Sequence, residues 1–245
     1  MKLIISPAKK MNEEEILEWR EFPVFLNRTE RILSFLQGLT YTEAKSLWKC
    51  NDQIAHQNME RLAEMDLRRN LSPAILAYEG IQYKYMAPGV LEKGSLEWLQ
   101  GHLRILSGFY GILKPMDGIV PYRLEMQAKA GIDGCRDLYA FWGESLYREL
   151  TGEDSVILNL ASKEYSRCIS DHLRENDRFI TCTFAEMNQG KLIQKGTLAK
   201  MARGEMVRFL AENQAEAPED AKKFDRLGFE YHEELSSENN SVFVK

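Results

Sequence analysis

Hydrophobic and polar residues follow two different periods along the chain, which predicts a mixture of strands and helices. Short, mostly apolar runs at residues 2–5 and 155–160 predict two buried strands. Apolar residues spaced three or four positions apart predict amphipathic helices over residues 27–37, 95–106 and 197–213.

Capping and turn residues indicate where further elements begin. Thr40 and Glu43 form a capping box, which predicts a helix ending near Cys50. Asn51 predicts the start of the next helix, over residues 52–65, and Asp137 caps a helix rich in aromatic side chains. The remaining predicted strands are residues 74–78, a hairpin of residues 178–186 and 191–194, and two short edge strands at residues 228–232 and 241–244.

Strands that alternate with helices predict an α/β or α+β fold, with a mixed β-sheet surrounded by helices. Of the 245 residues, 44% are hydrophobic, and no linker or internal repeat divides the chain, so we expect a single domain over residues 1–245. The first apolar run is too short for a signal peptide, and no run approaches the roughly 18 residues of a membrane helix. We therefore expect a cytoplasmic, monomeric protein that does not bind membranes.

The formal net charge of −5 argues against a protein coated in nucleic acid. Charge is unevenly distributed, because residues 191–208 hold five basic side chains and one acid, whereas residues 212–238 hold nine acids and three bases. Such alternation is consistent with a positive cleft inside an acidic exterior, and equally with ordinary solvated helix faces.

Cysteine and histidine spacing gives no sign of a metal or redox centre. No two cysteines form a C-x-x-C pair, so we expect free, mostly inert thiols rather than a peroxide sensor. The four histidines are scattered, and no metal-ligand spacing appears. We expect neither a metal nor another cofactor.

The stretch over residues 106–118 combines three glycines with a proline and anchoring aromatic residues. Gly108 and Gly111, with Tyr110 between them, look like a hairpin between two helices, the arrangement of helix-hairpin-helix modules that bind phosphate through backbone N–H groups. The alternative is a tight turn in a buried loop. Lys114 follows as a candidate phosphate contact.

Two polar pairs are candidates for holding an anion. Ser6 and Lys9 lie in the loop that leaves the first strand, where a hydroxyl and a mobile cation suit a phosphate. Strand-like alternation over residues 121–126 places Arg123 and Glu125 on one face, opposite Tyr122. The two charged groups form a structural ion pair or a guanidinium positioned to grip a phosphate or carboxylate.

Two later segments add further candidates. A strand followed by a serine at a helix start resembles the anion-binding corner of an α/β fold, where Asn159, Ser162, Glu164 and Tyr165 would surround a ligand; Ser162 as a simple helix cap is the alternative. The predicted helix over residues 197–213 presents basic side chains that could meet a phosphate backbone: Lys200, Arg203 and Arg208.

Several of these motifs occur in the same order as in one known family. The chain resembles the YaaA peroxide stress family, also catalogued as UPF0246 or DUF328. The residues that carry the resemblance are IISPAK at 4–9, LSGFYGILKPMDG at 106–118, LYAFWG at 138–143, NLASKEY at 159–165 and AKMARGEMVRF at 199–209. One position departs from the family pattern Gly-Asp-Val-Tyr, because this chain keeps Gly80 and Tyr83 but has Ile81 where the acid is expected.

The resemblance implies a single-domain fold with a positively charged cleft and a helix-hairpin-helix-like element. It also implies a role in resistance to hydrogen peroxide, by limiting free iron and oxidative damage to DNA. Two functional hypotheses follow. The first is a DNA-binding stress protein, in which Lys9, the Gly108–Gly111 hairpin and the basic residues named above contact phosphates. The second is an enzyme acting on a phosphorylated or nucleotide-like small molecule.

For the enzyme hypothesis, Lys9 and Arg123 would hold the anion and Lys200 would stabilise developing charge. Glu125 or Glu164 would act as the general base. The hypothetical catalytic residues are therefore Lys9, Glu125 and Glu164. The candidate DNA or anion contacts are Ser6, Lys9, Gly108, Tyr110, Gly111, Lys114, Tyr122, Arg123, Asn159, Ser162, Lys200, Arg203 and Arg208.

Overall fold

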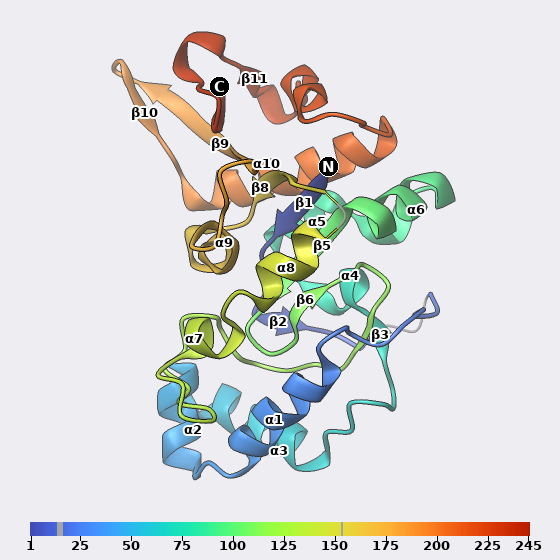
Figure 1. Cartoon of the computed structure of the whole chain (residues 1–245), viewed down its shortest axis with the longest axis vertical. Coiled ribbons are helices and arrows are strands. Elements are labelled where there is room, and N and C mark those ends of the chain that lie inside the picture. Colours follow the sequence, from blue (N-terminus) through green and yellow to red (C-terminus); the bar gives the residue numbers. More distant parts are fainter. Residues whose placement is uncertain (14–16, 153) are drawn as a thin grey trace.

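The two strands predicted from apolar runs lie side by side in the middle of a mixed sheet (Figure 1). The computed structural model describes residues 1–13, 17–152 and 154–245. Strand β1 (Lys2–Ile5) is buried along its whole length and pairs in parallel with β8 (Val156–Leu160) on one side and β5 (Leu103–Ser107) on the other. A strand with both neighbours parallel is covered on both faces, which explains why its sequence is apolar without alternation.

The sheet within the described ranges has eight strands, and its order is β11-β12-β9-β8-β1-β5-β6, with β10 paired to β9. β5 and β6 are antiparallel, whereas β9 and β12 are parallel, so the sheet is mixed, as predicted, and the fold is α/β, the first of the two predicted classes. Two small two-stranded sheets join β2 to β4 and β3 to β7. The remaining strands are β2 (Lys10–Met11), β3 (Ser72–Pro73), β4 (Tyr78–Glu79), β6 (Gly111–Leu113), β7 (Gly118–Ile119), β9 (Arg178–Asn188), β10 (Lys191–Ile193), β11 (Glu230–Tyr231) and β12 (Asn240–Val244).

Helices surround the sheet, with α1, α2 and α3 gathered at one end of the molecule and β9–β12 at the other (Figure 1). The helices are α1 (Leu26–Gln37), α2 (Tyr41–Trp48), α3 (Asp52–Glu64), α4 (Ala74–Ala77), α5 (Ile81–Met86), α6 (Lys93–His102), α7 (Leu138–Trp142), α8 (Ser145–Thr151), α9 (Lys163–Ser170) and α10 (Gly196–Glu212). Short 3-10 turns follow at Pro88–Val90, Pro218–Lys223, Arg226–Gly228 and Glu233–Leu235.

The capping residues predicted from the sequence cap their helices. The Glu43 N–H donates to the Thr40 side chain, and the Glu43 carboxylate accepts the Thr40 N–H, which completes the capping box of α2. Asn51 caps α3, and Asp137 accepts the Ala140 N–H at the start of α7. Each cap satisfies a helix N–H group that would otherwise have no partner.

Some predicted elements were wrong. Residues 74–77 form the short helix α4 and not a strand, and the helix predicted over residues 95–106 ends at His102 and is followed by β5. Residues 121–126 do not form a strand, although their side chains alternate in burial as predicted. β12 is not an edge strand, because it lies between β11 and β9. A short buried run of apolar residues has no period that separates helix from strand, which accounts for the first two errors.

The helix-hairpin-helix expectation is not confirmed, because the turn at Gly108–Tyr110 joins two strands, β5 and β6. The Ser107 hydroxyl accepts the N–H groups of Phe109 and Tyr110 at 3.1 and 2.9 Å, inside the core. A Cβ on Gly108 would lie 2.7 Å from the Leu124 carbonyl oxygen, so the turn packs directly against the 121–126 segment. The N–H groups of Phe109 and Tyr110 therefore already have a partner and are buried away from any phosphate.

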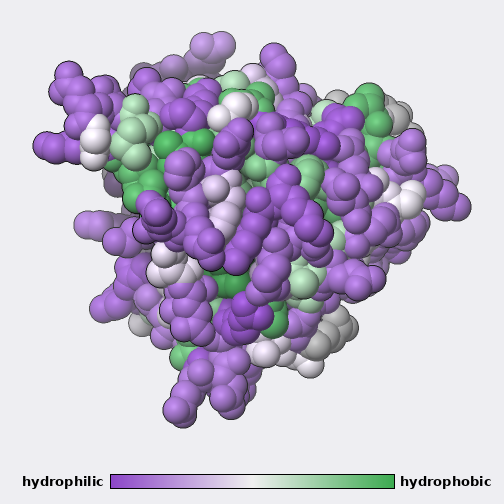
Figure 2. Space-filling model, turned by 90° about the horizontal axis from the view of Figure 1, so that it is seen from above, coloured by the Kyte–Doolittle hydropathy of each residue, from purple (hydrophilic) through white to green (hydrophobic). Residues whose placement is uncertain are grey.

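The face of the molecule shown in Figure 2 is largely hydrophilic, with apolar atoms in small scattered areas. None of the helices in the described part of the chain has the length and apolarity that a membrane crossing requires.

Candidate functional site

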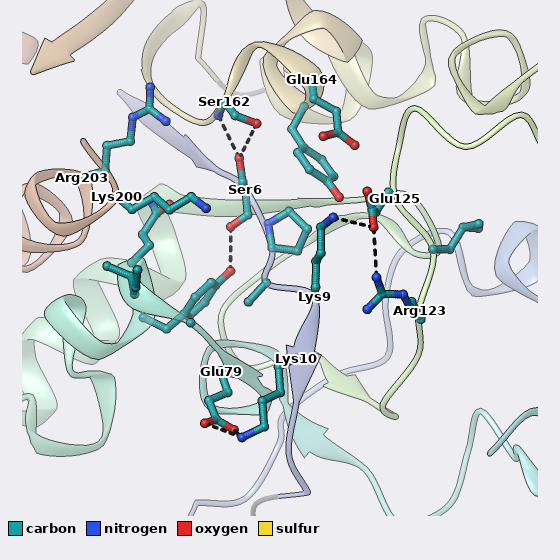
Figure 3. A pocket seen from close by; sticks show the side chains of 18 of the residues that line it. Ser6, Lys9, Lys10, Glu79, Arg123, Glu125, Ser162, Glu164, Lys200 and Arg203 are labelled. Carbon is teal, nitrogen blue, oxygen red and sulfur yellow. Dashed lines mark hydrogen bonds and ion pairs between the residues drawn. The ribbon is translucent and has the colours of Figure 1, made fainter. Parts of the chain in front are cut away.

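A cavity of about 570 Å³ lies where the carboxyl ends of β1 and β8 meet. Ile5 and Leu160 are partners in the parallel β1–β8 ladder, so the residues that follow them leave the sheet at the same edge. Ligands of open α/β sheets bind at this kind of position. Ser6 follows β1, and its hydroxyl accepts the Ser162 N–H at 2.8 Å and lies 3.2 Å from the Ser162 hydroxyl (Figure 3).

The cavity brings together most of the predicted site residues from distant parts of the sequence. Its walls come from the loop after β1, the start of α5, the 122–125 segment, the start of α9 and one face of α10. The predicted residues that line it are Ser6, Lys9, Tyr122, Arg123, Glu125, Ser162, Glu164, Tyr165, Lys200 and Arg203.

Arg123 and Glu125 pair as predicted, and Lys9 joins them. Glu125 Oε1 lies 3.5 Å from Arg123 Nη2 and 2.9 Å from Lys9 Nζ, so one carboxylate is shared by two cations. The Arg123 side chain is only 13% exposed, whereas that of Lys9 is 65% exposed. Arg123 is thus a fixed group in the wall, and Lys9 is a mobile cation at the mouth.

Glu164 lies in the first turn of α9, beside this cluster. Its Oε1 accepts the Gln127 N–H at 3.3 Å. Burial raises the pKa of Glu164 above its ordinary value, and the nearby Glu125 acts in the same direction, while Lys9 opposes both. A carboxyl whose pKa moves towards neutral is better suited to proton transfer than an ordinary surface glutamate.

Lys200 and Arg203 lie one turn apart on α10 and reach the cavity from the opposite side (Figure 3). Lys200 is exposed, while Arg203 is mostly buried and burial lowers its pKa. Helix α5 packs closely here, since a Cβ on Gly204 would lie 2.1 Å from the Gln82 carbonyl oxygen. This contact brings the backbone of α5 at Gln82 against α10 at Gly204, the residue that follows Arg203.

Three buried N–H donors in the cavity wall have no hydrogen-bond partner among the described residues. They are the Nε atoms of Arg123 and Arg203 and the Nε2 atom of Gln82. Buried donors are nearly always paired, and leaving one unpaired costs about 1–3 kcal/mol. All three groups are donors, so a hydrogen-bond acceptor would satisfy each of them.

Other predicted residues lie outside the cavity. The hydroxyl of the buried Tyr110 accepts the Val120 N–H, and Gly108 and Gly111 lie in the turn that joins β5 to β6. Lys114 lines a separate cavity of about 150 Å³ with Asp117. Asn159 does not line the cavity. Its Oδ1 accepts the Ala161 N–H at 2.9 Å and so supports the turn between β8 and α9. Arg208 points to a different face of α10, where its Nε lies 2.7 Å from a Glu212 oxygen.

Some cavity residues were not predicted as site residues. Tyr83 donates its hydroxyl to the Ser6 carbonyl oxygen at 3.0 Å and so fixes the loop after β1. Lys10 and Glu79 form an exposed ion pair at the rim, at 2.6 Å. Gln82 was overlooked, although the departure at Ile81 from the family pattern drew attention to this segment. Ile81 is 38% exposed and lines the cavity as an apolar group.

Tyr122 lines the cavity, and its hydroxyl forms hydrogen bonds inside the core. That hydroxyl is hydrogen bonded with Ser107 Oγ at 2.6 Å and with the Tyr78 hydroxyl at 2.8 Å. Burial raises the pKa of Tyr122 to about 12. Tyr122 is therefore a neutral, rigid wall residue at physiological pH and does not supply a base.

Two of the four cysteines are expected to resist alkylation in the native protein. Burial raises the pKa of the Cys168 and Cys182 thiols to about 12, and the thiolate is the reactive form. At pH 8, iodoacetamide should modify the partly exposed Cys50 and Cys135 and leave the buried pair unmodified until urea unfolds the chain. Peptide mapping by mass spectrometry measures this. Modification of Cys182 in native protein as fast as that of Cys50 would contradict the expected protection.

Known proteins with similar sequences show which family the chain belongs to. The family described as "Peroxide stress protein YaaA" matches residues 1–235. The chain belongs to the YaaA peroxide stress protein family. Similar relatives include a UPF0246 protein of Lachnoclostridium phytofermentans, 56% identical over 100% of this chain and 96% of the relative. A UPF0246 protein of Agathobacter rectalis is 54% identical over 100% of this chain and 99% of its own length.

Proposed function

We propose that this YaaA family member binds a phosphorylated, nucleotide-like ligand in the cavity, and that this binding underlies its part in peroxide stress. The observation that carries the proposal is the set of three unpaired, buried donors in the cavity wall. Five cationic side chains line the same cavity against three carboxylates, so the ligand that supplies the acceptors is an anion. A volume of about 570 Å³ is the size of a small-molecule site.

The site also has groups that could carry out chemistry on such a ligand. Glu164 has a raised pKa and faces Lys9 and Glu125, which gives a proton acceptor next to a mobile amine. In an enzyme, Glu164 or Glu125 would act as the general base, and Lys200 would stabilise negative charge that develops in the transition state.

DNA is the second candidate ligand, favoured by the exposed lysines Lys9 and Lys200 at the cavity. Lys114, Arg208 and the β5–β6 turn lie elsewhere, so these residues would not extend a phosphate track along a duplex. Contact would instead be local, with one nucleotide of a distorted strand entering the cavity. In this version, shielding such DNA would limit the damage that iron and peroxide cause together.

Arg203→Gln is expected to weaken the binding of phosphorylated ligands. Nucleotides and sugar phosphates should raise the melting temperature of the parent protein in a saturable way. The variant should lose about tenfold or more in affinity, because a hydrogen bond to a charged group is removed. Arg208→Gln is the matched control, since Arg208 lies on the same helix and pairs with Glu212 outside the cavity.

Binding to DNA by the parent and by a Lys200→Ala variant distinguishes the two candidate ligands. Binding to plain and bubble-containing duplexes is measured by fluorescence anisotropy across a salt series. A DNA ligand predicts preference for the bubble, a steep salt dependence, and a salt slope reduced by about one unit in Lys200→Ala. Saturable stabilisation by small phosphates without DNA binding favours the small-molecule function. Absence of any thermal shift across the panel, with no DNA binding at low salt, would rule out the proposed function.

A further inference from the structure

The charged side chains of the cavity form two groups at opposite ends. Figure 3 shows Arg203 and Lys200 on one side, Arg123 with Glu125 on the other, and Ser6 and Lys9 between them. We name these the Arg203 end, formed by Lys200 and Arg203 together with Gln82 of the adjoining helix α5, and the Arg123 end, formed by Lys9, Arg123, Glu125 and Glu164.

The charges at the Arg123 end cancel. Glu125 contacts both Lys9 and Arg123. Burial raises the pKa of Glu164, and the negative charge of the nearby Glu125 adds to this shift. Two cations therefore face two carboxylates. The unpaired Nε–H of Arg123 remains available as a donor, but an additional negative charge at this end would approach Glu125 and Glu164.

The charges at the Arg203 end do not cancel. The third carboxylate of the cavity, Glu79, pairs with Lys10 at the rim, and Glu205, the acid nearest in sequence to Arg203, pairs with Arg226 at 3.2 Å. Burial lowers the pKa of Arg203, and the nearby Cys182 thiol opposes this shift. Gln82, a residue that is 7% exposed, adds its unpaired Nε2 as a neutral donor at the same end.

An uncompensated, mostly buried guanidinium is unfavourable until an anion reaches it. The excess positive charge of the whole cavity is therefore concentrated at one end, next to two donors that lack acceptors. The Arg123 end offers one donor within a neutral network and repels further negative charge.

On the basis of the proposed function, we infer that the ligand has unlike ends. It carries one anionic group, bound by Arg203, Lys200 and Gln82, and an uncharged acceptor such as a carbonyl or hydroxyl oxygen, which accepts from Arg123. The substrate class is a phosphate monoester with a single anionic end, of nucleoside monophosphate or sugar monophosphate type. Bisphosphates are disfavoured, because their second phosphate faces Glu125 and Glu164.

The inference is tested by calorimetric titration of the full chain with three probes: inorganic phosphate, a nucleoside 5′-monophosphate and the corresponding 3′,5′-bisphosphate. Inorganic phosphate reports the Arg203 end alone. Its affinity should fall about tenfold or more in Arg203→Gln and change less than about twofold in Arg123→Gln. The monophosphate should lose affinity in both variants, and the bisphosphate should bind the parent no more tightly than the monophosphate does.

Lys200→Gln provides a second variant at the Arg203 end, and because Lys200 is exposed its replacement leaves the core intact. This variant should bind inorganic phosphate with an affinity about fivefold lower than that of the parent. Arg208→Gln serves as the unchanged control. Two results would contradict the inference that the ligand has unlike ends and still leave the proposed function standing. The first is loss of phosphate binding in Arg123→Gln but not in Arg203→Gln. The second is binding of the bisphosphate about tenfold tighter than that of the monophosphate. Failure of all three probes to bind would overturn both.

Discussion

Replacing Gly204 with alanine is expected to lower the free energy of unfolding by about 3 kcal/mol. The new Cβ would lie 2.1 Å from the Gln82 carbonyl oxygen and 3.0 Å from the Met86 nitrogen, and neither backbone atom can rotate away. Helices α5 and α10 must separate, at a cost typical of overpacking. Because these helices carry Gln82 and Arg203, the same change should also abolish ligand binding. Urea denaturation measures the stability loss.

Gly196→Ala is the matched control in the same helix. A Cβ on Gly196 would meet nothing within 4 Å, so alanine should leave the stability unchanged or raise it by up to about 1 kcal/mol. Equal stability of Gly204→Ala and the parent would show that α5 and α10 do not approach as closely as described.

Replacing Asp117 with asparagine is expected to remove a large pH dependence of stability. Burial raises the pKa of Asp117 from 3.8 to about 7, Glu21 adds to the effect, and Lys114 and Arg104 oppose it. Between these two values the native state holds the proton more tightly than the unfolded state, so stability falls as the pH rises through this range. Between pH 5 and 8 the free energy of unfolding of the parent should fall by about 3 kcal/mol relative to that of the variant.

The measurement is urea denaturation of both proteins at pH 5, 6, 7 and 8. Asparagine has nearly the same shape as aspartate and can still accept the Lys114 N–H, which Asp117 Oδ2 accepts at 2.9 Å. Parallel pH profiles for the two proteins would show that Asp117 titrates in the native state as it does in the unfolded chain.

The two strands that position the site could be predicted from the sequence. Apolar runs identified β1 and β8, and the serines that follow them were predicted as anion contacts. Their meeting depends on a parallel pairing between segments more than 150 residues apart, which no local pattern encodes. Leu103–Ser107 was missed as a strand because it is buried along its length and lacks the alternation that distinguishes strand from helix.

The site residues were only partly predictable for similar reasons. Arg203 and Arg208 both lie on the basic helix, and only the fold shows that Arg203 reaches the cavity. Glu212, four residues after Arg208, was a signal that Arg208 is paired along the helix surface. No sequence pattern indicated Gln82, because its place in the cavity depends on the close approach of α5 to α10 at Gly204. From the sequence alone, a glycine within a helical pattern indicates only a residue of low helix propensity.

Binding of a phosphorylated ligand to the unpaired donors of the cavity connects the site to the proposed function. The most direct measurement is a calorimetric titration of the parent protein and Arg203→Gln with a nucleoside 5′-monophosphate at low salt. We expect saturable one-to-one binding by the parent and an affinity about tenfold or more weaker in the variant. Equal binding by the two proteins, or no binding by the parent, would contradict it.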